Sequence, residues 1–195
     1  MDPDQRLWKA WKAWKAMAVP EIARAEIDED SITISVIGDL RHAAVGGGLR
    51  KALTKHLRGT GYTATQGRYV TAGLKAMKPD LAVAPDDTKA TEHPEGVGLL
   101  ASGIPLVAEV VWPDCYERRD QEFKPRAYAS AGIPVYVIID DYDHGGTVTV
   151  LSRPDAERRA YASSTRIPYG EEAVIPEGPA KGFVIGPEIT GERRG

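Results

Sequence analysis

Three almost continuously apolar segments predict the centre of a covered β-sheet. They span residues 81–84, 105–112 and 135–139. A strand with one face in water alternates apolar and polar residues, whereas an uninterrupted apolar strand needs cover on both faces. We therefore expect residues 81–84, 106–111 and 135–139 to be neighbouring strands of one sheet that helices flank.

Weaker patterns predict the remaining elements. Alternation and β-branched residues predict strands at 31–37, at 62–70 with a break at Gly67, and at 147–151 after a turn at 144–146, with short strands near Tyr161 and at 183–185. Helix-forming composition predicts helices at 7–17, 43–56 and 117–131, the last with Pro125 in its first turn or at a kink and Gly132 closing it. The sum is a mixed α/β fold.

The first predicted helix carries a near-repeat of Trp-Lys-Ala with indoles at Trp8, Trp11 and Trp14. Such a stripe suits a membrane surface, stacking on nucleic-acid bases, or packing on the chain's own domain. We favour packing, because tryptophan buries a large apolar area. We expect residues 1–20 to form a helical extension and residues 21–195 to form one domain.

Length and composition narrow the class of protein. With 195 residues, 42% hydrophobic and 27% charged, the chain has the composition of a soluble globular domain. Its apolar runs are shorter than the roughly 20 residues that span a bilayer, and the N-terminus lacks the apolar core of a signal peptide. The single cysteine, Cys115, excludes an internal disulfide and argues against a thiolate zinc site. We expect a cytoplasmic protein without membrane contact.

Charge is unevenly distributed along the chain. The net charge is −3, yet residues 40–79 contain no acidic residue. Their eight basic residues are Arg41, Arg50, Lys51, Lys55, Arg58, Arg68, Lys75 and Lys78. Such segregation favours a surface for nucleic-acid phosphates, with Arg41, Arg50, Lys51 and Lys55 as candidates. The alternative is an ordinary solvated helix face with neutralising neighbours elsewhere.

Two carboxylates and one lysine stand out as candidates for chemistry. Glu109 lies inside the apolar segment 106–111, where an ionised carboxylate is costly unless it is paired or binds a metal ion. The alternative is a buried ion pair with Arg118 or Arg119. Asp80 precedes the neighbouring strand, so the two carboxylates together offer hard oxygen ligands to Mg²⁺. Lys124 follows on the next helix, from which it can point back at them.

These segments carry a resemblance to a known family. Residues 79–83 (PDLAV) and 107–111 (VAEVV) resemble the core of the PD-(D/E)XK nuclease fold. Residues 118–140, from Arg-Arg-Asp through Phe-Lys-Pro-Arg-Ala-Tyr-Ala to Val-Ile-Ile-Asp, resemble the Uma2 family (DUF820) of restriction-endonuclease-like proteins. The resemblance covers about residues 26–183 and implies a restriction-endonuclease-like core.

The resemblance implies a role for each matching residue. It makes Asp80 and Glu109 the metal-binding carboxylates, with the carbonyl of Val110 as a further ligand, and Lys124 the catalytic lysine. Supporting positions are Asp120, which precedes that lysine, Glu26 before the first strand of the pattern, and His42 before the first long helix; Arg119 joins the candidates for nucleic-acid contact. The sequence departs from the pattern at Val111, at 112–116, and at Val135 and Val137.

The function that follows from the residues and the resemblance is a Mg²⁺-dependent endonuclease that hydrolyses DNA phosphodiester bonds, with Mn²⁺ as a substitute ion. A homodimer is expected, because cutting both strands of a duplex needs two active sites or repositioning. The main alternative is a catalytically silent nuclease-fold module that binds nucleic acid or a protein. A metal-dependent hydrolase acting on another substrate is a third possibility.

Overall fold

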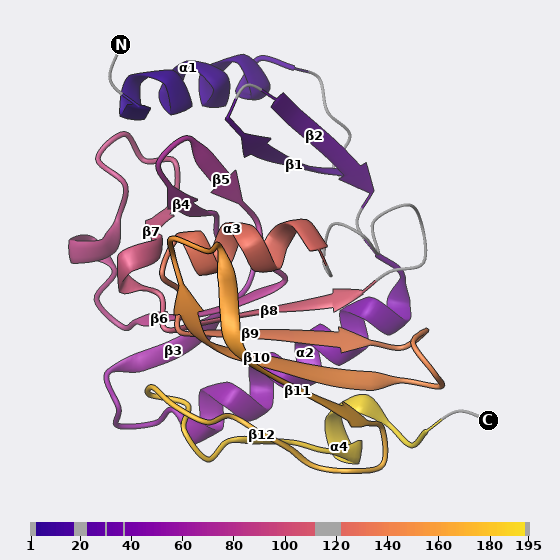
Figure 1. Cartoon of the computed structure of the whole chain (residues 1–195). Coiled ribbons are helices and arrows are strands. Elements are labelled where there is room, and N and C mark those ends of the chain that lie inside the picture. Colours follow the sequence, from indigo (N-terminus) through magenta and orange to yellow (C-terminus); the bar gives the residue numbers. More distant parts are fainter. Residues whose placement is uncertain (1–2, 18–22, 30, 37, 112–121, 194–195) are drawn as a thin grey trace.

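The computed structural model describes residues 3–17, 23–29, 31–36, 38–111 and 122–193. Its main sheet has the strand order β11-β10-β9-β8-β6-β3 and is shown in Figure 1. The strands are β3 (Tyr62–Thr65), β6 (Leu81–Pro85), β8 (Leu106–Val111), β9 (Val135–Asp140), β10 (Thr147–Asp155) and β11 (Ala160–Pro168). Strands β8 and β9 are parallel, and the other neighbours are antiparallel. The expected adjacency of β6, β8 and β9 is confirmed.

Helices cover both faces of this sheet, as the uninterrupted apolar strands require. On one face, Leu49 and Leu53 of α2 (Leu40–His56) pack with Leu81 and Val110. On the other face, α3 (Lys124–Ser130) contributes Tyr128 to a second apolar cluster. In Figure 1, α3 lies above β8 and β9, and the yellow C-terminal segment lies below the strands.

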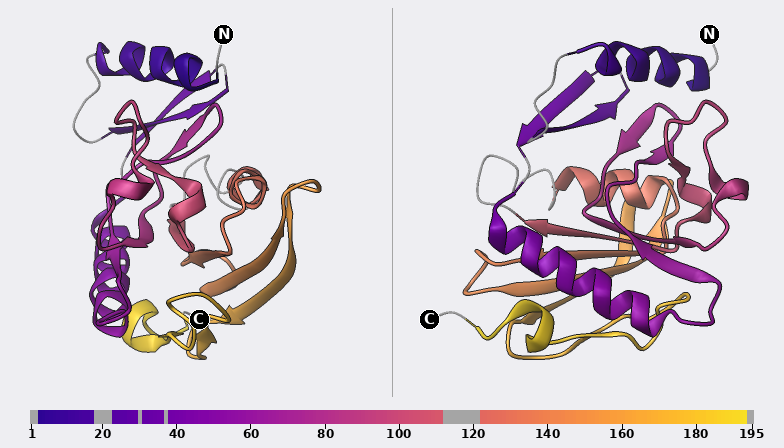
Figure 2. Two further views of the ribbon diagram at one scale, coloured as in Figure 1. Left: turned by 90° about the vertical axis from the view of Figure 1, so that its left-hand side faces the viewer. Right: turned by 180° about the vertical axis from the view of Figure 1, so that it is seen from behind.

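A smaller sheet lies beside the main one, in the order β2-β1-β5-β4-β7. Its strands are β1 (Ala23–Asp28), β2 (Ser31–Val36), β4 (Val70–Ala72), β5 (Lys75–Met77) and β7 (Leu99–Leu100). Helix α1 (Pro3–Lys15) packs across it, with Leu7 and Trp11 buried against Ile27 and Tyr69, and Figure 2 shows the helix over β1 and β2 from two further sides. The tryptophan repeat therefore packs on its own fold, and the boundary at residue 20 stays a prediction.

Two predicted elements differ from the structure in part. For the strand expected at 62–70 with a break at Gly67, the break is confirmed, but the two pieces do not share a sheet: β3 belongs to the main sheet and β4 to the small one. Gly67 adopts a φ of +73°, a left-handed conformation that turns the chain between them. Helix α3 begins at Lys124 with Pro125 in its first turn and ends before Gly132 (φ +73°), while residues 117–121 of the predicted helix lie outside the described part.

The remaining elements are short. They are η1 (Lys89–Thr91), η2 (Ala101–Gly103), β12 (Ala173–Val174), β13 (Val184–Ile185) and α4 (Pro187–Thr190). Helix α2 starts three residues earlier than expected, because Asp39 caps it by accepting a 2.9 Å hydrogen bond from the amide of His42. Within the described residues, no helix has the length and apolar character to cross a membrane.

Candidate active site

Strand register brings the two predicted carboxylates together. Leu81 pairs with Ala108, and the ladder between β6 and β8 ends there. Continued by one position, the same register sets Asp80 opposite Glu109. Residues directly opposite in an antiparallel pair have Cβ atoms about 5 Å apart. Two residues far apart in the sequence are thus neighbours on adjacent strands.

Both carboxylates also lie on the same face of the sheet. Side chains alternate between faces along a strand, and Ala82 and Val107, two positions from Asp80 and Glu109, belong to the apolar cluster under α3. From α3, the ammonium of Lys124 lies 2.8 Å from Oε1 of Glu109. The hydroxyl of Tyr128, one turn further along α3, donates a 2.9 Å hydrogen bond to the same oxygen.

Asp80 is held by donors from three directions. Its Oδ2 accepts a 2.8 Å hydrogen bond from the amide of Val110 and lies 3.0 Å from Nε2 of His42. Its Oδ1 accepts a 2.8 Å hydrogen bond from Nη1 of Arg24. Burial raises the pKa of Asp80, but the hydrogen bond with His42 and the charges of Arg24 and Lys124 outweigh it and hold that pKa well below its usual value.

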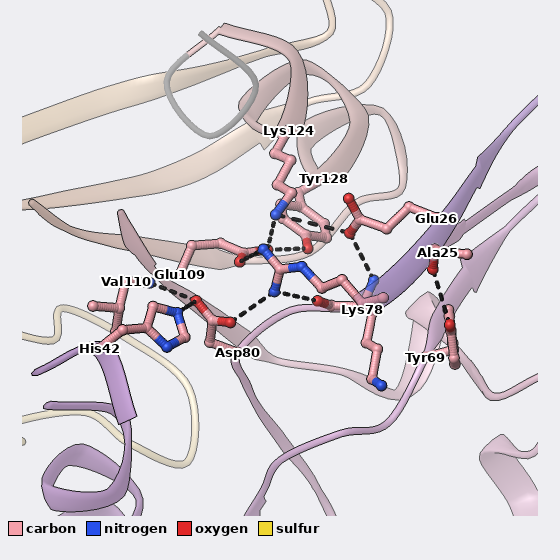
Figure 3. Close-up of polar contacts among 11 residues, drawn as sticks. Ala25, Glu26, His42, Tyr69, Lys78, Asp80, Glu109, Val110, Lys124 and Tyr128 are labelled. Atoms are coloured by element: carbon pink, nitrogen blue, oxygen red, sulfur yellow. Dashed lines mark hydrogen bonds and ion pairs between the residues drawn. The ribbon is translucent and has the colours of Figure 1, made fainter. Parts of the chain in front are cut away.

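Arg24 of β1 connects the two carboxylates. Its guanidinium contacts Asp80 at 2.8 Å through Nη1 and Glu109 at 4.0 Å through Nη2. One cationic group therefore lies between both acids. The neighbouring Glu26, two residues on and on the same face of β1, accepts a 2.9 Å hydrogen bond from the amide of Lys78 and lies 3.8 Å from the ammonium of Lys124. Figure 3 shows the contacts of Glu26, His42, Asp80, Glu109, Lys124 and Tyr128.

The side chains of the cluster differ in their exposure to solvent. Glu109 and Lys124 have side chains that are 0% and 1% exposed, and Asp80 is 7% exposed. The exposed fraction rises to 13% for His42 and 18% for Arg24. Arg24 and His42 are therefore the members of this set with the most contact with solvent.

The donor set fits a divalent cation. The contacts of Arg24 show that Asp80 and Glu109 already share one positive charge between them, and carboxylate oxygens are the ligands that Mg²⁺ prefers. In the described part of the chain, no three His, Cys, Asp or Glu side chains converge as a metal site. A Mg²⁺ ion here would take two carboxylates and complete its six positions with water, a phosphate oxygen or a backbone carbonyl, for which Val110 stays the predicted source.

The predicted nucleic-acid residues are divided among several environments. Arg41 pairs with Asp141, with a 2.8 Å contact between Nε and Oδ2. Arg50, Lys51 and Lys55 of α2 line a separate cavity of about 760 Å³ that reaches Ile189. The predicted positions Arg119 and Asp120 lie outside the described residues, as does Arg118, the other predicted ion-pair partner of Glu109.

Sequence reasoning missed two members of the cluster. Arg24 lies on β1, a strand that no pattern indicated, and it reaches a residue 56 positions away. Tyr128 lies in the family-like segment, and its spacing of one helical turn from Lys124 was the available signal, because residues four apart share a helix face.

Comparison with known proteins adds a family and a fold. The family model Uma2, described as "Putative restriction endonuclease", matches residues 11–185. A solved structure described as a putative nuclease belonging to DUF820 from Anabaena variabilis ATCC 29413 matches with a TM-score of 0.69 and 16% identity, covering 97% of each chain. No curated protein matches the chain. At this identity the structural likeness shows the fold, which is restriction-endonuclease-like.

Proposed function

The chain belongs to the Uma2 family, and from this premise we propose that it is a Mg²⁺-dependent endonuclease that hydrolyses DNA phosphodiester bonds. The observation that carries the proposal is the joint contact of Arg24 with Asp80 and Glu109, with Lys124 beside Glu109. Two carboxylates that share one cation, next to a buried ammonium, are suited to hold a divalent ion against a phosphate.

Each side chain has a part in this proposal. Oxygens of Asp80 and Glu109 hold the ion, which when bound supplies Lewis-acid chemistry to the phosphodiester. The ammonium of Lys124 holds the attacking water and offsets negative charge that develops on the phosphate. Tyr128 and His42 are positioning residues, because their hydrogen bonds fix the orientation of Glu109 and Asp80.

Binding of DNA involves the basic side of α2 in this proposal. Arg50, Lys51 and Lys55 lie on that helix, and Glu188 is the one acid among the described residues that line the same cavity. Contacts of this kind with phosphates fix the position of a duplex without reading its bases. A homodimer, a cytoplasmic location and the use of Mn²⁺ in place of Mg²⁺ stay predictions.

The direct test is incubation of the protein with supercoiled plasmid and Mg²⁺ or Mn²⁺. We expect nicked and linear products, none with EDTA, and none from Asp80→Ala. Asp141→Asn is the matched control, because it changes a buried carboxylate outside the cluster and leaves the metal ligands in place. Equal cleavage by the wild type and Asp80→Ala would refute the assignment of the site.

A further inference from the structure

A second cavity lies where α1 meets the small sheet. It has a volume of about 460 Å³, and its lining includes Trp11, Trp14, Lys15, Arg68, Tyr69 and Lys78. The three aromatic rings form one cluster: Trp11 and Trp14 are 4.7 Å apart between centroids, and each contacts Tyr69 at 4.8 and 5.6 Å. The volume falls in the range of small-ligand sites.

The charge of this cavity is predominantly positive. The ammonium of Lys15 lies 5.0 Å from the ring centroid of Trp14, and that of Lys78 lies 5.5 Å from Tyr69. Arg68 contributes a third cation, which contacts Glu92 at 3.5 Å. Among the described residues of the lining, Glu92 is the one acidic side chain. Three cations against one carboxylate favour an anionic ligand.

The cavity is connected to the candidate active site through one short segment. The backbone of Lys78 donates to Glu26 and accepts from Arg24 at 3.4 Å, two residues before Asp80. The side chain of Lys78 points away from the carboxylates, on the side of Tyr69, as Figure 3 shows. The same segment thus contributes its backbone to the candidate active site and its ammonium to the cavity.

We propose that this cavity binds a nucleotide unit of the nucleic-acid strand, next to the unit that lies at the carboxylate cluster. Lys15 and Lys78 contact its phosphate, and the aromatic rings that line the cavity pack against its sugar or base. Aromatic side chains with nearby cations bind nucleic-acid strands without reading their sequence. The choice of a strand as ligand rests on the proposed nuclease function.

The test measures binding of a fluorescent DNA duplex in EDTA, so that the result does not depend on cleavage. Lys15→Gln/Lys78→Gln is compared with Lys12→Gln, whose ammonium lies over Trp8 outside the cavity. We expect the double variant to bind about tenfold more weakly, and to lower the slope of log affinity against log salt by about 1, because one phosphate contact is lost. We expect Lys12→Gln to match the wild type.

A second variant separates binding from folding. Lys15→Met keeps the aliphatic stem beside the indole rings but removes the ammonium, so we expect weaker DNA binding at an unchanged thermal midpoint. Inorganic phosphate and a mononucleotide serve as competitors, because a free anion shares the same chemistry. We expect a single-stranded oligonucleotide to compete at far lower concentration than either.

Each remaining outcome has a defined meaning. The proposal would be overturned if the double variant had the same affinity and salt slope as Lys12→Gln. It would also be overturned if the wild type did not bind DNA, or if inorganic phosphate competed as strongly as the oligonucleotide. Loss of affinity in the double variant, together with an absence of plasmid cleavage by the wild type with Mg²⁺ or Mn²⁺, would support the cavity while refuting the nuclease function.

Discussion

Two groups of charged side chains contact the main sheet, and they are built differently. One joins Arg41 at the start of α2 to Asp141 after β9, through contacts of 2.8 and 3.2 Å. Tyr169 donates a 2.7 Å hydrogen bond to the same carboxylate, and Arg41 also donates to the carbonyl of Thr190. The hydrogen bond and the charge of Asp141 raise the pKa of Arg41 against the lowering effect of burial. In this group, one cation and one anion neutralise each other.

The other group shares its charges among several partners. Asp80 contacts Arg24 and His42, while Glu109 contacts Lys124 and, at longer range, Arg24. The bidentate pair holds two segments of the fold together. The two carboxylates that share several cations can instead exchange one bound cation for another. This difference makes the Arg41–Asp141 pair a structural contact and the Asp80–Glu109 cluster the candidate for metal chemistry.

The sharpest test of this contrast is Glu109→Gln. The change keeps the side-chain volume but removes a charge that a metal ion needs, so we expect plasmid cleavage to fall by about a thousandfold. Circular dichroism and thermal melting check the fold. If the variant fails to fold, Glu109 is part of a structural ion pair; if it folds and cleaves normally, the carboxylate has no catalytic part.

Asp141→Asn tests the other side of the contrast. We expect the free energy of unfolding to fall by about 1–3 kcal/mol, because the charge partner of Arg41 is lost while an amide oxygen can still accept. Arg41 is 35% exposed, so solvent screens part of the pair. Urea titration measures the stability, and cleavage per folded molecule should equal that of the wild type. A large loss of cleavage in the folded fraction would place Asp141 in the active site.

The variant Arg24→Gln tests whether the guanidinium that contacts both carboxylates competes with Mg²⁺ for them. The guanidinium contacts both carboxylates, so its positive charge opposes the approach of Mg²⁺. Its removal should tighten Mg²⁺ binding by about tenfold, as expected for the loss of a nearby like charge. Isothermal titration calorimetry measures this directly, with Arg41→Gln as the control arginine. Weaker Mg²⁺ binding by the Arg24 variant would mean that Arg24 organises the carboxylates instead of competing with the ion.

The smallest effect is expected for Tyr128→Phe. The hydroxyl donates one hydrogen bond to Glu109, and such a bond contributes about 1 kcal/mol. Burial, together with the negative charges of Glu109 and Glu26, raises the pKa of Tyr128 well above its usual value, so the hydroxyl stays protonated and continues to donate. We expect a few-fold fall in single-turnover cleavage with unchanged DNA affinity. Cleavage equal to the wild type would show that Lys124 alone positions Glu109.

The basic stretch at residues 40–79 shows that the order of charges along the chain does not predict which of them are neutralised in the fold. The sequence predicts one basic surface over residues 40–79, yet Arg41, Arg68 and Lys75 contact acidic residues that lie outside this stretch. Their partners are Asp141, Glu92 and Asp28. Neutralisation depends on which strands and loops meet in space, and a count of charges along the chain carries no such information.

By itself, the sequence determined the covered strands and the buried position of Glu109. Both follow from local patterns, because a continuous apolar run shows that both faces of a strand need cover. The tertiary structure determined that Asp80 stands opposite Glu109 and that Arg24 reaches both. The physical reason is that register and the pairing of distant strands come from the packing of the whole sheet, in which a shift by one residue would turn each side chain to the other face.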